Sequence, residues 1–243
     1  MKRELAIAAL MATGFLAGCE PPSAPDAASS ATPGSSETVA PATPANGAPM
    51  LDAASYPPRD DCGALPGWPA FRTQLDKAVA ARDADALAAI TDPDVRLDFG
   101  GGAGTKELRQ RLVDPDYRLW DELAAILPLG CGPQDGGGAA MPWIFANSPA
   151  DADPFNAMLV LGPAVAVRAE PDAAAPATAR LNWAIVDLAQ GYEGPDKPFA
   201  AVILPGGGKG YVETARLRSL VDYRLLATRT PQGWRITALI AGD

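Results

Sequence analysis

The sequence contains no histidine among its 243 residues. Histidine is the usual general base for serine and cysteine nucleophiles, and it is a common zinc ligand. Its absence therefore excludes Ser–His–Asp triads, Cys–His nucleophiles and histidine-ligated zinc. We expect a protein that is not an enzyme and that carries no cofactor and no metal.

Basic residues are also scarce. The chain has 20 Lys and Arg against 29 Asp and Glu, which gives a formal net charge of −9. Proteins that bind nucleic acid neutralise phosphates with clustered Lys and Arg side chains, and no such cluster occurs here. The composition therefore predicts no nucleic-acid partner.

A hydrophobic run long enough to span a bilayer is missing as well. The apolar stretch near the N-terminus covers only residues 5–17, whereas a spanning helix needs about 18 or more. The stretch follows Lys2 and Arg3 and leads into small residues, which is the pattern of an export signal. We therefore predict a signal peptide at residues 1–18.

The end of this signal has a further feature. Leu16-Ala-Gly-Cys19 resembles the lipobox of bacterial lipoproteins. The resemblance implies that Cys19 is lipidated and becomes the first residue of the mature chain, so that the membrane is a partner through this anchor. In the sorting pattern of these lipoproteins an Asp after the cysteine retains the protein in the inner membrane. Glu20 therefore favours a periplasm-facing location at the outer membrane.

Cysteine is rare, with three in the chain. If Cys19 is acylated, Cys62 and Cys131 remain, and export places them in an oxidising compartment. Two cysteines in that setting predict a disulfide bond rather than free thiols.

Residues 19–55 contain mostly Pro, Ala, Ser and Thr and few large apolar side chains. Such a segment cannot bury enough apolar surface to offset the entropy lost on folding. We therefore expect a disordered tether between the anchor and a folded head.

The first part of the head, residues 56–157, reads as a helical α+β module. Hydrophobic periodicity predicts helices at 69–81, 86–90, 106–112 and 119–127, a strand at 95–99 and a short extended segment at 141–145. The helix, strand and Gly turn of residues 71–112 resemble the opening of nuclear-transport-factor-like domains.

The last part, residues 220–243, contains two alternating strands at 222–228 and 233–240, joined by a turn. Two strands alone are marginal in water. We expect this hairpin to complete a small antiparallel sheet with strand 95–99 under the first helices. In an alternative layout the hairpin packs on the β-segments that precede it.

Those segments lie within residues 158–219, at 158–161, 164–168, 180–188, 199–203 and 210–212. Short strands at this spacing predict a small antiparallel barrel. The order Ala166-Val-Arg-Ala-Glu-Pro171, a strand at Leu181 and Lys209-Gly-Tyr-Val212 resembles the bacterial Src-homology-3-like domain family. The predicted fold class is α+β, with this all-β barrel inserted in the helical module.

Three aromatic residues are candidates for ligand binding on the barrel rim. They are Tyr192, in a loop rich in Gly and Pro, and Phe199 and Tyr211, near strand ends. Rings in these places stack on sugars or grip peptides. Arg168 matches the Val-Arg-x-x-Pro position of the resembling family, which implies a hydrogen-bonding role in the fold.

Two other patterns are better explained as structural. The glycines at 100–104 precede Thr105 and Lys106, but neither the Walker nor the dinucleotide spacing is met, so we expect a flexible turn. Asp92 and Asp94 flank a proline, as turn residues commonly do.

Three further acids, Asp187, Glu193 and Asp196, lie in or beside a loop, where solvated charge is normal. We therefore expect these side chains to be exposed and structural rather than catalytic.

The leading hypothesis is a non-enzymatic envelope lipoprotein whose barrel binds peptidoglycan or a peptide of an envelope protein. A second hypothesis is a small-molecule or catalytic pocket in the α+β module, lined by Trp68, Asp98, Trp120 and Tyr223. A third is a structural accessory of an envelope assembly.

Overall fold

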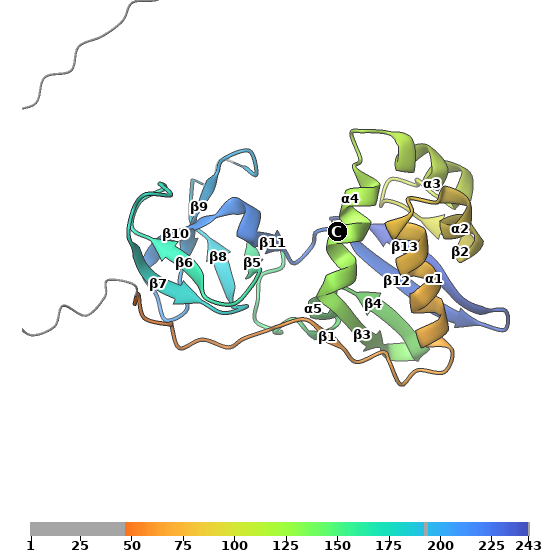
Figure 1. The fold of residues 1–243 in the computed structure, drawn as a ribbon, viewed down its shortest axis with the longest axis horizontal. Coiled ribbons are helices and arrows are strands. Elements are labelled where there is room, and N and C mark those ends of the chain that lie inside the picture. Colours follow the sequence, from red (N-terminus) through yellow and green to blue (C-terminus); the bar gives the residue numbers. More distant parts are fainter. Residues whose placement is uncertain (1–46, 192–193, 243) are drawn as a thin grey trace, which may run out of the picture. The chain divides into compact units, whose positions relative to one another are not determined.

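The computed structural model describes residues 47–191 and 194–242 (Figure 1). The predicted signal peptide, the lipidation of Cys19 and most of the tether lie outside the described residues, as do Tyr192 and Glu193. The described chain is a mixed α+β structure with two main sheets, as predicted at the level of fold class.

The first sheet has six strands in the order β1-β3-β4-β12-β13-β2. The C-terminal hairpin lies inside it, because β12 pairs with β4 and β13 pairs with β2. The β13–β2 pairing is parallel, in contrast to the antiparallel sheet we expected. The strands are β1 (Arg59–Asp60), β2 (Thr91–Arg96), β3 (Gly130–Gln134), β4 (Gly138–Met141), β12 (Arg224–Thr230) and β13 (Gly233–Ile240).

Four helices accompany this sheet and follow the predicted segments closely. They are α1 (Trp68–Ala80), α2 (Ala84–Ala89), α3 (Gly104–Val113) and α4 (Leu119–Ile126). Asp83 caps α2 by accepting hydrogen bonds from the backbone N–H groups of Asp85 and Ala86. Such a cap satisfies donors that the first helical turn leaves unpaired.

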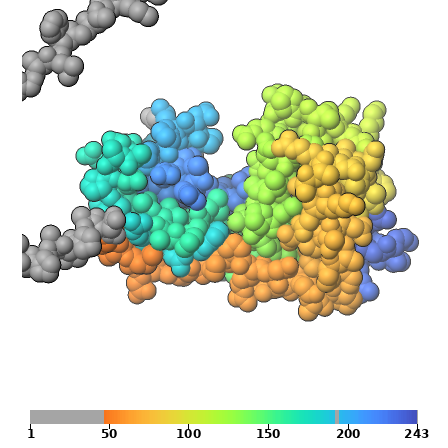
Figure 2. Space-filling view, in the orientation of Figure 1, coloured from red at the N-terminus to blue at the C-terminus, as the bar shows by residue number. Residues whose placement is uncertain are grey.

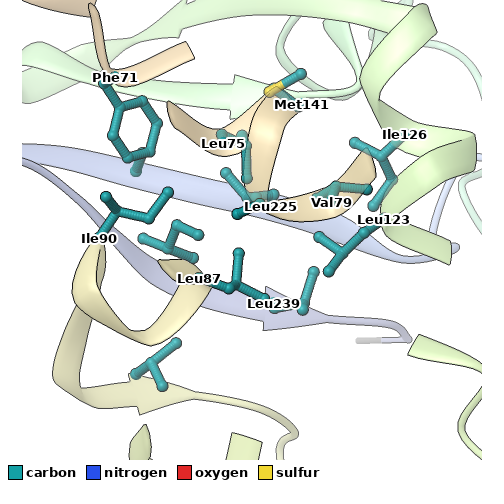
Figure 3. Close-up of a cluster of buried hydrophobic side chains, with 14 of the residues drawn as sticks. Phe71, Leu75, Val79, Leu87, Ile90, Leu123, Ile126, Met141, Leu225 and Leu239 are labelled. Atoms are coloured by element: carbon teal, nitrogen blue, oxygen red, sulfur yellow. The ribbon is translucent and has the colours of Figure 1, made fainter. Parts of the chain in front are cut away.

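The helices and the sheet share one hydrophobic core (Figure 3). Helix α1 places Leu75 and Val79 toward Leu225 of β12 and Leu239 of β13, and α4 contributes Leu123. Leu75, Leu123 and Leu225 are fully buried. The 3.6-residue period of α1 and α4 and the two-residue period of the hairpin produce this contact.

Several elements of this sheet differ from our expectations. Strands β3 and β4 occupy a glycine- and alanine-rich segment for which we predicted no strand. Residues 141–145, expected to be extended, instead lead into helix α5 (Trp143–Asn147), which begins directly after Pro142. Strand β2 begins at Thr91 and contains Pro93, which is tolerated because β2 is an edge strand.

The disulfide between Cys62 and Cys131 is present, as predicted. It joins the segment before α1 to β3, with a Cα–Cα distance of 5.7 Å and a sequence separation of 69 residues. Both cysteines are fully buried. The bond therefore fixes the edge of the sheet to the start of the helical layer.

The second sheet has seven strands in the order β11-β5-β8-β9-β10-β6-β7, all paired antiparallel. Among the described residues, the two outer strands, β11 and β7, do not pair with each other. The strand pairing therefore establishes an open sheet and not a closed barrel. The strands are β5 (Ala157–Val160), β6 (Val165–Arg168), β7 (Ala177–Leu181), β8 (Ile185–Leu188), β9 (Phe199–Ile203), β10 (Lys209–Glu213) and β11 (Leu217–Ser219).

Two features of this sheet were not predicted. The single strand expected at 180–188 is split into β7 and β8, because Trp183 between them adopts a positive φ of 49° that ends β7. Strand β11 is three residues long and pairs with β5. The sheet has its own core, in which Val167, Val202 and Val212 are fully buried.

Residues 49–56 lie along this sheet, although we expected the tether to extend to residue 55. Leu51 N–H donates to the carbonyl of Arg180, and Arg180 N–H donates to the carbonyl of Pro49. Tyr56 N–H donates to the carbonyl of Trp183. In Figure 2 this orange segment lies against the teal strands. The segment therefore extends the edge at β7.

Candidate functional site

A groove of about 1040 Å³ opens on the seven-stranded sheet. Its floor is apolar and includes Met158 of β5, Leu188 of β8 and Leu217 of β11, and two aromatic rings, Phe155 and Phe199, stand beside it. The remaining lining residues come from the 194–198 loop, the turn Thr214–Arg216 and nearby positions: Ala173, Pro195, Asp196, Lys197, Pro198, Glu213, Thr214, Ala215, Ser219 and Asp222.

Phe199, one of the three predicted ligand-binding residues, lines this groove. It begins β9, where Ala200 and Val202 point into the core of the sheet. Because side chains alternate along a strand, Phe199 lies on the opposite face. Its position is fixed further by a hydrogen bond from Thr214 N–H to the carbonyl of Pro198.

Tyr211, the second predicted residue, lies on the same face of the sheet but does not line the groove. It is paired with Ala201 of β9 and with Arg168 of β6. Arg168 donates a hydrogen bond to the carbonyl of Ala175, which agrees with a role in holding the fold. The third predicted residue, Tyr192, lies outside the described residues.

Phe155 was missed by reasoning from the sequence, although it is 66% exposed. It sits in a turn that Asp153 organises. The Asp153 carboxylate accepts from Phe155 N–H, and the Asp153 carbonyl accepts from Asn156 and Ala157 N–H. A large apolar residue directly after Asp-Pro in a turn was the available signal, because such a position favours exposure.

The charged side chains at the groove are mostly acidic. Glu213 on β10 is paired across the strands with Phe199, and Asp196 is exposed in the 194–198 loop. Asp222 forms an ion pair with Arg218 at 3.3 Å. The arrangement combines apolar surface, two aromatic rings and carboxylates, which suits the binding of a ligand.

The glycine turn at 100–104 is occupied by the protein's own side chains. Gly102 N–H donates to the Asp98 carboxylate at 2.7 Å, and Asp98 is paired with Arg111. A Cβ at Gly102 would lie 2.1 Å from both of these side chains, so a larger residue there would displace the Asp98–Arg111 pair. The amide that a phosphate would need is therefore already bonded to a carboxylate.

The four residues proposed to line a pocket in the α+β module, Trp68, Asp98, Trp120 and Tyr223, lie in or against the core or are bonded to neighbouring side chains. Trp68 and Trp120 are 1% and 9% exposed and belong to the core around α1 and α4. Tyr223 is half-buried against that core, and burial raises the pKa of its hydroxyl. The hydrogen bond from Arg111 lowers the pKa of Asp98. Asp98 is therefore an ion-paired acid rather than an isolated one.

One group of potential metal ligands occurs in the described ranges. Ligand atoms of Asp60, Cys62 and Cys131 lie within 4.8 Å of one another. The two sulfur atoms are bonded to each other, so neither is available as a thiolate. This group therefore does not fit a metal centre.

In the part of the chain that the structure describes, no helix is both long and apolar enough to cross a membrane.

Comparison with known proteins gives few matches. No family model matches the chain, and no curated protein matches it. One solved structure is described as an NTF2-like protein with a cystatin-like fold, from Novosphingobium aromaticivorans. It has 14% sequence identity and a TM-score of 0.27, over 72% of this chain and 80% of that chain. A TM-score of this size does not establish a shared fold.

Proposed function

We propose that the protein is a non-enzymatic lipoprotein of the bacterial envelope that binds a peptide segment of peptidoglycan or of an envelope protein. The binding site is the groove between Phe155 and Phe199. The observation that supports this function most directly is the groove itself, because a concave, largely apolar surface lined by two aromatic rings is typical of an interaction site.

The location supports the same function. The predicted export signal and the lipobox-like Leu16-Ala-Gly-Cys19 favour a location at a membrane, facing the periplasm. Residues 20–46 then separate the anchor from the described strands by up to about 90 Å when extended. This reach lets the groove contact material at a distance from the bilayer.

The barrel also belongs to the proposal. The seven strands share one core with buried residues from β6, β7, β9 and β10, among them Val167, Leu181, Val202 and Val212. We infer that these strands curl into a Src-homology-3-like barrel, in agreement with the sequence pattern around Arg168 and Tyr211. A small barrel places its loops together at one rim, where the groove opens.

Co-sedimentation with purified sacculi tests wall binding. The full chain is purified in a non-ionic detergent, and the wild type is compared with Phe155→Ala. Phe155 is 66% exposed, so its removal costs the fold little. We expect the wild type to be retained and Phe155→Ala to be retained several-fold less.

Phe99→Ala is the matched control, because Phe99 is also an exposed ring, at 50%, but it lies outside the groove. It should be retained like the wild type. Equal retention of wild type and Phe155→Ala would contradict wall binding through the groove.

A further inference from the structure

We propose that the groove selects a ligand segment that carries a cationic side chain, of the lysine or arginine type, next to an apolar one. This inference rests on the proposed function, because it specifies the class of ligand for the same groove. Two observations support the inference: Glu213 lies opposite Phe199 on neighbouring strands, and the charged side chains that line the groove are mostly acidic.

Glu213 and Phe199 form a cross-strand pair on the face that opens into the groove. Directly opposed residues on one face have side chains about 5 Å apart at Cβ. Glu213 is half-buried and has no ion pair with any described residue. A carboxylate beside an aromatic ring attracts an ammonium or guanidinium group both by charge and by the ring's negative face.

The apolar half of the groove lies next to this pair. Met158, Leu188 and Leu217 line this part, and the ring of Phe155 lines the same groove. The stem of a lysine or arginine side chain packs on such a surface while its charged end reaches a carboxylate. A single lysine or arginine side chain can therefore contact both the apolar surface and the carboxylate of the groove.

The charge balance favours a cation over an anion. Asp196 and Glu213 are carboxylates with no ion pair to a described residue, and Asp222 is already paired with Arg218. Lys197 supplies one basic side chain to the described lining. An anionic ligand would meet this excess of negative charge, in a chain whose net charge is −9.

The chain's own N-terminal segment does not suit the groove. Residues 20–58 contain acidic side chains but no Lys or Arg, since the first basic residue after the signal is Arg59. Charge complementarity therefore points to a separate cationic partner rather than to self-occupation.

Three fluorescent peptides test the inference: acetyl-Ala-Lys-Leu-Lys-Ala-amide and its versions with glutamine or glutamate in place of lysine. Binding to the full chain in non-ionic detergent is followed by fluorescence polarisation. We expect the lysine peptide to bind most tightly and its affinity to fall as salt is raised. The double variant Asp196→Asn/Glu213→Gln should weaken its binding about fivefold, because two exposed charge pairs are lost.

Asp187→Asn is the matched control, since Asp187 is an exposed carboxylate of β8 that lies outside the groove. It should bind the lysine peptide as the wild type does. Three results would overturn the cation preference. All three peptides could bind equally, the glutamate peptide could bind more tightly than the lysine peptide, or the double variant could bind the lysine peptide as tightly as the wild type does. If the sacculi assay still depends on Phe155 in that case, the groove remains the site and only its ligand class is wrong.

Discussion

Arg111 on α3 is buried, with 6% of its surface exposed, and nearly every part of its guanidinium has a partner. It pairs with Asp98, donates a hydrogen bond to the Glu107 carboxylate at 2.9 Å, and donates another to the carbonyl of Leu97 at 2.9 Å. Its guanidinium carbon lies 4.7 Å from the ring centre of Tyr117. At the scale of single residues, this one side chain holds the glycine turn against α3.

The substitution Arg111→Ala should lower the free energy of unfolding by about 2–3 kcal/mol, because it removes the bonds of a buried guanidinium and leaves the buried carbonyl of Leu97 without this donor. Urea denaturation measures this change. Arg109→Ala on the same helix is the control, since its ion pair with Asp85 is exposed and should be worth less than about 1 kcal/mol. Similar losses for both variants would show that burial does not determine the contribution of these pairs.

The two perturbed carboxyls of this region predict opposite pH effects. The bond from Arg111 lowers the pKa of Asp98 below that of an ordinary aspartate, so its stabilisation is complete above the ordinary pKa and is lost as the pH falls through the lowered one. Burial, together with nearby Asp222, raises the pKa of Glu122 above 4.5. Its stabilisation is complete below pH 4.5 and is lost as the pH rises through the folded-state pKa.

Glu122→Gln should therefore be more stable than the wild type at pH 7, and the difference should shrink toward pH 4. Asp98→Asn should be less stable at pH 7, and its difference should shrink below pH 4. Urea titrations at several pH values measure both. A wild-type advantage over Glu122→Gln that grows toward neutral pH would contradict the assigned cause.

At the scale of elements, the helices and strands that could be predicted were those whose own sequence has a strong hydrophobic or capping pattern. Helices α1 and α4 carry apolar residues at helical spacing, and α2 has its Asp83 cap, so their positions were evident. Strands β3 and β4 were not, because glycine and alanine carry no strand signal. Gly130 is required by packing instead: a Cβ there would lie 2.0 Å from the carbonyl oxygen of Arg59 on β1.

The candidate site was predictable in part for the same reason. The strands that carry Phe199 and Tyr211 were predicted from their composition, and the pairing of β9 with β10 puts both side chains on one face of the sheet. Whether a residue on that face lines a groove depends on loops distant in sequence. Phe155 and Glu213 line the same groove although they are 58 positions apart, and no local pattern encodes such a juxtaposition.

The disulfide between Cys62 and Cys131 is the covalent link between elements. It closes a loop with a sequence separation of 69 residues, and chain entropy alone predicts a contribution of about 4 kcal/mol. The double substitution Cys62→Ala/Cys131→Ala should lower the free energy of unfolding by an amount of this order, as measured by urea denaturation. A loss below about 1 kcal/mol would mean that the sheet and helices constrain this segment without the bond.

At the scale of the whole molecule, the proposal joins a membrane anchor to a binding head. Cys19→Ser should remove the acyl group, so that the protein moves from the membrane fraction to the soluble periplasmic fraction and no longer incorporates labelled palmitate. Fractionation and metabolic labelling measure the two effects. Unchanged membrane association of Cys19→Ser would rule out the anchor at this residue.

Site-specific photo-crosslinking in living cells tests the binding groove most directly. A benzoylphenylalanine is placed at Ala215, an exposed residue that lines the groove, and at Ala80, an exposed residue at the end of α1 as the control. The account predicts crosslinks to peptidoglycan or to a defined envelope protein from position 215, reduced by Phe155→Ala, and none of these from position 80. Identical products from both positions, or no product from position 215, would contradict it.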